Sequence, residues 1–258
     1  MNAKGFTLVE LAVVLAIVAL LLSTTLFTLS AQTENRNFEE NRRRLEQVRE
    51  LTLAFAISKG RLPCPATSTS LGQESFTSGT CTSFYDGFVP AKTLGFSPTD
   101  NEGYALDAWG NRIRFAVANL YTDCTGTATP HFVNSTNLKA NGISCQPNDL
   151  LVCRSATGIT GTSCGTAFGT SGENQLMATS LLVAVIVSGG KNLATASTSA
   201  LATTAGRIDE AANLNGDRIF VWHTPTDSGA SNGEFDDQLA WITVGELYGR
   251  MVTAGVLP

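Results

Sequence analysis

The sequence predicts an α+β fold, in which a long N-terminal α-helix packs on an antiparallel β-sheet head with a disulfide-rich loop region. Three observations lead to this expectation. An apolar N-terminal run continues into a charged segment with helical periodicity. Four short segments rich in β-branched and aromatic residues follow it. Six cysteines lie among stretches rich in Gly, Ser and Thr.

Composition limits the classes of function. The chain has 258 residues, of which 43% are hydrophobic, enough for one sizeable domain. Charged residues make up 15%, below the roughly 25% that is usual for soluble domains. The net charge is −5, and nucleic-acid binding relies on clustered Lys and Arg, so nucleic acid is not indicated as a partner. The cysteines form no CxxC pair and only two histidines occur, so no zinc site is expected.

Residues 6–31 form the expected transmembrane helix. They are apolar or small apart from Glu10 and a few polar residues, and at about 1.5 Å per residue they are long enough to cross a bilayer core of about 30 Å. A secretory signal peptide cleaved near Ser30–Ala31 is the alternative. An acidic residue costs roughly 2.5–3.5 kcal/mol at the centre of a membrane helix, so Glu10 needs a cationic partner that the helix itself lacks. Cleavage after Gly5 would create one, because the new amino group on Phe6 has a pKa near 8.

The stretch GFTLVEL, preceded by a short leader with a lysine, resembles the N-terminus of type IV prepilins. That family comprises major and minor pilins and the pseudopilins of type II secretion. The resemblance implies that residues 1–5 are a leader, which a prepilin peptidase removes between Gly5 and Phe6. It also implies N-methylation of Phe6 and an assembly salt bridge between Glu10 and the N-terminal amine of an adjacent subunit.

Residues 32–59 are expected to continue the same helix as an amphipathic segment. One apolar stripe recurs near the helical period, and no proline interrupts the segment before Gly60. The stripe consists of Phe38, Leu45, Val48, Leu51 and Phe55. We therefore expect one helix from Phe6 to about Ser58, followed by a pilin-like globular head over residues 60–258.

Within the head, four strands and one helix are predicted. The strands are expected at residues 112–118, 181–188, 218–223 and 238–244. The last segment, from Val244, is expected to form a short helix with Leu247, Met251 and Val252 on one face. Residues 61–104 and 124–173 are rich in turn-forming residues, and the second stretch is expected to contribute little to the core.

The segment DAWGNRIRF, Asp107 to Phe115, resembles the DPWGN-type segment of pseudopilins, with alanine in place of proline. Asp107 and Asn111 are turn residues that bond their own backbone, Gly110 permits positive φ, and Trp109 is expected to anchor the turn in the core.

The six cysteines are expected to form disulfides in an oxidising compartment, since their number is even and they follow an export-type N-terminus. Six cysteines allow fifteen pairings. We favour sequential pairing, because each bridge then closes a short loop. The expected pairs are Cys64–Cys81, Cys124–Cys145 and Cys153–Cys164.

Two groups of residues are candidates for chemistry in the head. The stretch GTSCG fits the GxSxG pattern, and a hydrolase with Ser163 and His223 is an alternative, but the flanking strand and helix that this motif needs are not predicted. Oxygen-rich stretches occur at residues 209–217 and 227–237, and calcium takes six to eight oxygen ligands from such loops. Some pseudopilins hold calcium in a C-terminal loop. Solvated turns without a cation are the alternative, because Asp and Asn are ordinary turn formers. The candidate calcium ligands are Asp227, Glu234, Asp236 and Asp237, and no other cofactor is expected.

The expected function is that of a non-enzymatic, minor-pilin-like subunit of a type IV pilus or related filament, with the head for tip, adhesion or interaction roles. A type II secretion pseudopilin and a membrane-tethered adhesin that does not polymerise are the alternatives. The expected partners are the prepilin peptidase, other pilin or pseudopilin subunits and an inner-membrane assembly platform. The expected location is the inner membrane with a periplasmic head, and after assembly the pilus at the cell surface.

Overall fold

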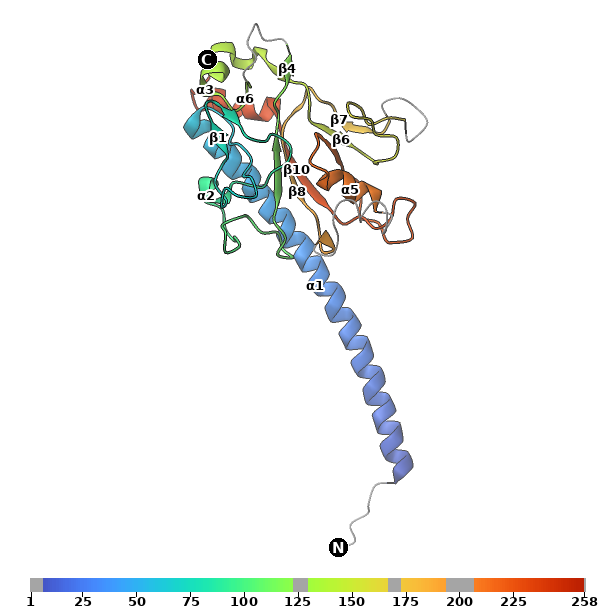
Figure 1. Cartoon of the computed structure of the whole chain (residues 1–258). Coiled ribbons are helices and arrows are strands. Elements are labelled where there is room, and N and C mark those ends of the chain that lie inside the picture. Colours follow the sequence, from blue (N-terminus) through green and yellow to red (C-terminus); the bar gives the residue numbers. More distant parts are fainter. Residues whose placement is uncertain (1–6, 123–129, 167–172, 194–206, 258) are drawn as a thin grey trace. The chain divides into compact units, whose positions relative to one another are not determined.

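The computed structural model describes residues 7–122, 130–166, 173–193 and 207–257, apart from the side chains of residues 22–31 and 122 (Figure 1). The chain divides into two compact units, one up to Glu40 and one from Asn41 onward. The first helix, α1 (Leu8–Lys59), supplies the described part of the first unit and the beginning of the second. The prediction of one helix from Phe6 to about Ser58 therefore agrees with the structure to within two residues.

The second unit contains the other helices and all the strands. The helices of the described residues that follow α1 are α2 (Ala91–Leu94), α3 (Ser135–Asn141), the 3-10 helix η1 (Gly142–Ser144), α5 (Ile208–Leu214) and α6 (Val244–Thr253). The strands are β1 (Phe76–Thr77), β2 (Thr80–Cys81), β3 (Arg114–Val117), β4 (Tyr121–Thr122), β5 (Gln146–Pro147), β6 (Leu151–Cys153), β7 (Gln175–Met177), β8 (Leu182–Ser188), β9 (Ile219–Val221) and β10 (Gln238–Thr243). All four predicted strands are present as β3, β8, β9 and β10.

The main sheet has the strand order β10-β8-β3 and is antiparallel throughout. Ile186 of β8 lies opposite Phe115 on one side and Ala240 on the other. Every residue of β8 is buried, which explains why its sequence is a continuous apolar run rather than an alternating one.

A second three-stranded sheet has the order β7-β6-β9. Here β6 and β9 are parallel, with Val152 opposite Phe220, so the expectation of a purely antiparallel sheet is wrong at this pair. A parallel pair needs a long crossover connection, and the chain between β6 and β9 supplies one that contains β7, β8 and α5. Two short antiparallel pairs complete the sheets of the described residues: β1-β2, which is a hairpin, and β4-β5, whose strands are separated in the chain by α3 and η1.

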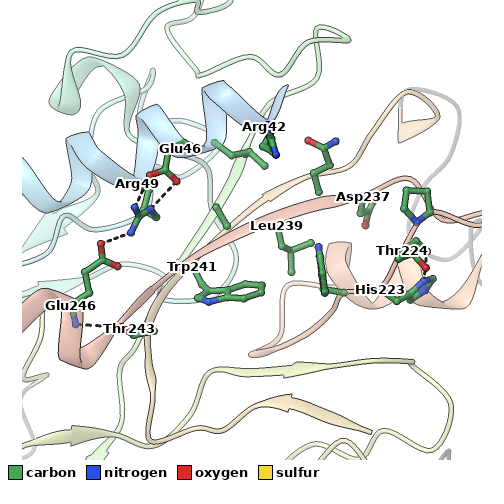
Figure 2. Close-up of a pocket in the computed structure, with 15 residues that line it drawn as sticks. Arg42, Glu46, Arg49, His223, Thr224, Asp237, Leu239, Trp241, Thr243 and Glu246 are labelled. Atoms are coloured by element: carbon green, nitrogen blue, oxygen red, sulfur yellow. Dashed lines mark hydrogen bonds and ion pairs between the residues drawn. The ribbon is translucent and has the colours of Figure 1, made fainter. Parts of the chain in front are cut away.

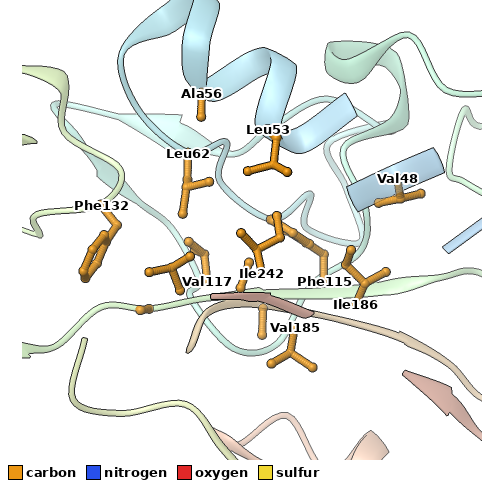
Figure 3. Packing of buried hydrophobic residues seen from close by; sticks show 14 of the residues in the cluster. Val48, Leu53, Ala56, Leu62, Phe115, Val117, Phe132, Val185, Ile186 and Ile242 are labelled. Carbon is orange, nitrogen blue, oxygen red and sulfur yellow. The ribbon is translucent and has the colours of Figure 1, made fainter. Parts of the chain in front are cut away.

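The main core lies between the second half of α1 and the main sheet (Figure 3). Val48 and Leu53 of α1 are buried against the face that carries Phe115, Ile186 and Ile242. The period of 3.6 residues in α1 and the period of two in the strands bring these side chains to one interface.

Three expectations about the core are wrong. The stretch 124–173 contributes more core than expected. Phe132, Val133, Leu138, Leu150 and Val152 are buried in the main core, and Leu151 is buried in a smaller one. Trp109 is half-buried and stands outside the main core cluster. On α6, Val252 is 44% exposed while Leu247 and Met251 are buried.

Two disulfides are present among the described residues, Cys64–Cys81 and Cys153–Cys164. They are the first and third of the sequential pairs expected from the sequence. Cys145 is also disulfide-bonded, and its expected partner Cys124 lies outside the described residues.

The DAWGN segment forms the turn that its residue types predict. The Asp107 carboxylate accepts hydrogen bonds from the backbone N–H groups of Trp109 and Asn111, at 2.9 and 2.8 Å. Gly110 has φ +87°. The Ser188 hydroxyl donates to Asp107 at 2.7 Å, which ties the turn to the end of β8.

Candidate functional site

The N-terminal part of α1 exposes large apolar side chains. Between Leu8 and Leu21 these side chains lie all round the helix rather than on one face, and each is at least 44% exposed within its unit; they are Leu8, Val9, Leu11, Val13, Val14, Leu15, Ile17, Val18, Leu20 and Leu21. A helix that is apolar all round is typical of a segment buried in a larger assembly or in a membrane. Among the residues that the structure describes, no helix combines the length and apolarity of a membrane span. The transmembrane assignment of residues 6–31 therefore stays a prediction.

Glu10 closes a capping box at the start of α1. The Thr7 hydroxyl accepts a hydrogen bond from the Glu10 backbone N–H at 3.2 Å, and the Glu10 carboxylate accepts from the Thr7 backbone N–H at 2.9 Å. This reciprocal pair satisfies two N–H groups that have no partner within the helix. Glu10 therefore has a local role in starting the helix in addition to any role of its charge.

A cluster of three buried carboxyl groups, the acidic site, lies in the second unit. It consists of Glu210 on α5 and of Asp236 and Asp237, which directly precede β10. Each residue offers one carboxylate oxygen, and these oxygens all lie within 4.8 Å of one another. All three side chains are at most 3% exposed.

The acidic site has fewer hydrogen-bond donors than its oxygens require. Arg207 forms an ion pair with Glu210 at 3.1 Å, and Asn213 donates to Asp237 at 2.7 Å. One oxygen each of Asp236 and Asp237, the two Oδ1 atoms, is buried with no hydrogen-bond partner among the described residues. A buried unpartnered oxygen is costly, and three carboxylates this close repel one another when ionised.

The electrostatics follow from this geometry. Burial, together with the neighbouring Glu210, raises the pKa of Asp236 to about 7. The same two causes raise the pKa of Asp237 well above its usual range, and burial raises the pKa of Glu210. The site can thus be neutralised by protons or by a divalent cation, for which carboxylate oxygens are suitable ligands.

The structure brings together only half of the expected calcium ligands. Asp236 and Asp237 lie in the acidic site, but Asp227 is exposed and accepts a hydrogen bond from the Gly229 N–H in a local turn. Glu234 forms an ion pair with Lys191 at 3.6 Å. Asp227 and Glu234 are thus not members of this cluster.

Glu210 is not among the ligands expected from the sequence, because residues 209–217 are expected to form a loop, whereas most of them form α5. The sequence AANL, with apolar residues at helical spacing, was the available signal.

The alternative hydrolase pair is not assembled in the described residues. The two ring nitrogens of His223 lie 3.1 Å from Asp209 Oδ2 and 2.7 Å from the Thr224 carbonyl oxygen. Burial lowers the pKa of His223, but these two hydrogen bonds outweigh burial and raise it. The hydroxyl of Ser163 instead pairs with that of Thr160 at 2.9 Å. Because both nitrogens of His223 face acceptors, the ring is placed to donate rather than to accept a proton from a serine.

The fold defines a class of protein, an α+β head attached to a long helix whose N-terminal part is apolar. Residues 1–26 match the family model described as the prokaryotic N-terminal methylation motif, the hallmark of type IV prepilin-like proteins. The match covers the leader, the expected cleavage site and Glu10, and it indicates a pilin-like or pseudopilin-like protein that a prepilin peptidase processes. Neither the curated proteins nor the solved structures include a match to this chain.

Proposed function

We propose that the protein is a minor-pilin-like structural subunit of a type IV pilus or a related filament. In this proposal, cleavage after Gly5 and methylation of Phe6 prepare the N-terminus. The apolar part of α1 then packs beside the helices of other subunits, and Glu10 neutralises the N-terminal amine of its neighbour. A pseudopilin of type II secretion is the second candidate within this proposal, since pseudopilins have the same type of N-terminal helix and head.

The match of residues 1–26 to the methylation motif carries this proposal. The exposed apolar side chains from Leu8 to Leu21 support it, because a water-exposed helix of this kind is unfavourable until it is buried. We place the unassembled subunit in the inner membrane with a periplasmic head, in keeping with disulfides that need an oxidising compartment. The disulfide-stabilised head would carry the tip, adhesion or interaction role.

Variants of Glu10 test the assembly role. Glutamine also serves in a capping box, so Glu10→Gln keeps the start of α1 but removes the charge, whereas Glu10→Ala removes both. We expect both variants to lower the amount of the subunit in sheared filaments at least tenfold, with unchanged amounts in the membrane fraction. Immunoblots of the two fractions from the native host measure this.

Thr7→Ser is the matched control, because serine keeps the capping hydroxyl, and it should assemble like the wild type. If Glu10→Gln assembles normally and Glu10→Ala does not, Glu10 acts in helix capping, and the proposed ion pair with the N-terminal amine of a neighbouring subunit is contradicted. If the wild-type protein itself is not incorporated into filaments, the membrane-tethered adhesin is favoured.

As a second role, we propose that the acidic site holds a calcium ion that stabilises the head. The support is the convergence of Glu210, Asp236 and Asp237 together with the buried, unpartnered oxygens of the two aspartates. A cation would add to the positive charge of Arg207 and Lys191, beside which the pKa values of all three carboxyl groups are still raised. Gly190 is part of the arrangement, since an added Cβ there would lie 1.7 Å from Asp236 Oδ1.

Thermal unfolding of the full chain in detergent tests the calcium site. At calcium a hundredfold above its dissociation constant we expect a stabilisation of about 2.7 kcal/mol, or roughly 5–10 °C in melting temperature, relative to EDTA. Asp237→Asn should abolish this shift, and Asp227→Asn, in the exposed turn, should retain it. A shift that depends on Asp227, or no shift in the wild type, would refute the site.

A further inference from the structure

Strand β10 is an edge strand with an open side. The main sheet has the order β10-β8-β3, and within the described residues no strand pairs with the other edge of β10. Such an edge presents a row of backbone donors and acceptors to which another chain can pair.

The register shows which residues point to the open side. The Ala118 N–H donates a hydrogen bond to the Val183 carbonyl oxygen. Because hydrogen-bonding direction alternates along a strand, the odd-numbered residues of β8 direct their backbone groups to β3, and the even-numbered ones direct theirs to β10. Ile186 lies opposite Ala240, so Ala240 bonds to β8, and its neighbours Leu239 and Trp241 direct their backbone N–H and C=O groups away from the sheet. These two residues therefore offer the open hydrogen-bonding groups.

The sequence of β10 lacks the usual protection of an exposed edge. The strand reads QLAWIT, without a charged residue or a proline, and its pairing with β8 is regular up to Ile242. Proteins commonly block open edges with lysine, proline, a bulge or a covering element. An unprotected edge of this kind is therefore available for pairing with another chain.

A groove of about 550 Å³ follows this edge (Figure 2). Five consecutive residues, Asp237 to Trp241, line it. Side chains of successive strand residues point to opposite faces, so a cavity that all five line must lie along the edge itself. Its volume is within the range of about 300–1,000 Å³ that is typical of ligand sites.

The two walls of the groove differ in chemistry. One wall is the second half of α1, where Arg49 forms ion pairs with Glu46 and with Glu246 of α6, so the opposite charges are close together. The rest of the lining combines Trp222, Pro225 and Leu239 with the polar His223 and Thr224. Trp222 is 37% exposed and contacts Trp241 edge-to-face at a centroid distance of 6.0 Å. Exposed tryptophans in a groove are typical anchors for a bound chain.

We propose that the open edge of β10 binds an extended polypeptide segment of another protein, which adds a fourth strand to the main sheet. The chemistry of the two walls specifies an alternating sequence. Apolar side chains face Trp222, Leu239 and Trp241, and uncharged polar side chains face the ion pairs of α1. The backbone of the segment pairs with the N–H and C=O groups of Leu239 and Trp241, as in other complexes formed by strand addition. This site goes beyond the proposed filament role and does not depend on it, because all its residues lie in the second unit.

The probe is a fluorescein-labelled peptide, lysine-(threonine-valine)₃-lysine, with blocked ends. Its binding to the full chain in detergent is measured by fluorescence anisotropy. We expect saturable binding, and at least tenfold weaker binding of the same peptide with N-methylated backbone amides, which keeps its side chains but cannot donate hydrogen bonds.

Two protein variants separate the two parts of the site. Leu239→Pro removes an N–H that points away from β8, a position where an edge strand tolerates proline. Trp222→Ala removes one apolar anchor and leaves the strand intact. We expect each to weaken binding at least tenfold, with an unchanged circular dichroism spectrum.

Three results would overturn the proposal. One is the absence of binding in the wild type. The second is equal binding of the two peptides, which would reduce the groove to an apolar pocket. The third is that the chain does not bind the peptide but associates with itself, and that Leu239→Pro abolishes this self-association. That result would assign the edge to a second copy of this protein.

Discussion

His131 is a buried imidazole that is held in its neutral form. It is 1% exposed, and its Nε2 lies 3.1 Å from the Tyr248 hydroxyl. That hydroxyl donates to the Cys145 carbonyl oxygen at 2.6 Å, so it accepts from the N–H of the imidazole. The other ring nitrogen, Nδ1, has no partner among the described residues. A second proton on the ring would therefore be buried without an acceptor, and burial lowers the pKa of His131 to about 4.

This residue makes the head sensitive to acid. The unfolded chain binds a proton at His131 below about pH 6.5, whereas the folded chain does so only near pH 4. The unfolded state thus gains protons first, and about 3 kcal/mol of stability is lost as the pH falls through this window. We expect His131→Phe, which does not titrate, to lose correspondingly less stability between pH 7 and pH 4.5.

Urea denaturation of both proteins at the two pH values measures the difference. Phenylalanine keeps an aromatic ring beside Phe132, whose ring lies edge-on to His131, and it leaves the hydrogen bond from Tyr248 to Cys145 intact. Equal losses in the two proteins would show that other groups cause the acid sensitivity.

At the scale of elements, α6 shows how tertiary packing selects one face of a helix. Thr243 caps its N-terminus by accepting a hydrogen bond from the Glu246 N–H. Leu247, Tyr248 and Met251 are buried, and Val252 is exposed. The i, i+4 spacing places Leu247 and Met251 on one face, whereas Val252 lies about 100° away from Met251, at 3.6 residues per turn.

Substitutions on α6 test this assignment. Met251→Ala removes a fully buried side chain and should lower the free energy of unfolding by about 2–5 kcal/mol. Val252→Ala, one position further, should change it by less than about 0.5 kcal/mol. Chemical denaturation measures both, and equal effects of the two substitutions would contradict the observed burial.

The two elements of the acidic site illustrate what sequence alone can predict. Asp236 and Asp237 were recognised from an oxygen-rich stretch, because acidic residues close together in the chain are visible as a pattern. Glu210 is 26 residues away from Asp236, and only the packing of α5 beside the start of β10 brings the two together. Sequence analysis therefore found the local half of this site and missed the non-local half.

At the scale of the whole molecule, the two units have different surfaces. The described part of the first unit exposes most of its large apolar side chains, whereas the second unit buries most of its own, chiefly in a main core and in a smaller one around Leu151 and Val221. The second unit also contains both described disulfides. Its stability is therefore expected to be independent of residues 1–40.

Truncations test this independence. A protein of residues 41–258, produced in an oxidising compartment, should unfold cooperatively on heating. A protein of residues 60–258 should not, because it lacks Leu45, Val48 and Leu53 of α1, which are buried in the main core. Near-UV circular dichroism during heating distinguishes the two, and a non-cooperative transition for 41–258 would contradict the division into units.

The sequence by itself determined the features that depend on neighbouring residues. These are the methylation motif, the single long helix, the four predicted strands and the turn at Asp107, each of which depends on a local motif, a local period or a local hydrogen-bonding residue. Tertiary structure alone decided the parallel pair of β6 and β9, the completion of the acidic site by Glu210 and the open edge of β10 beside Trp222. The physical reason is that these features depend on which distant segments are buried together, and burial is a property of the whole packed chain rather than of any one stretch.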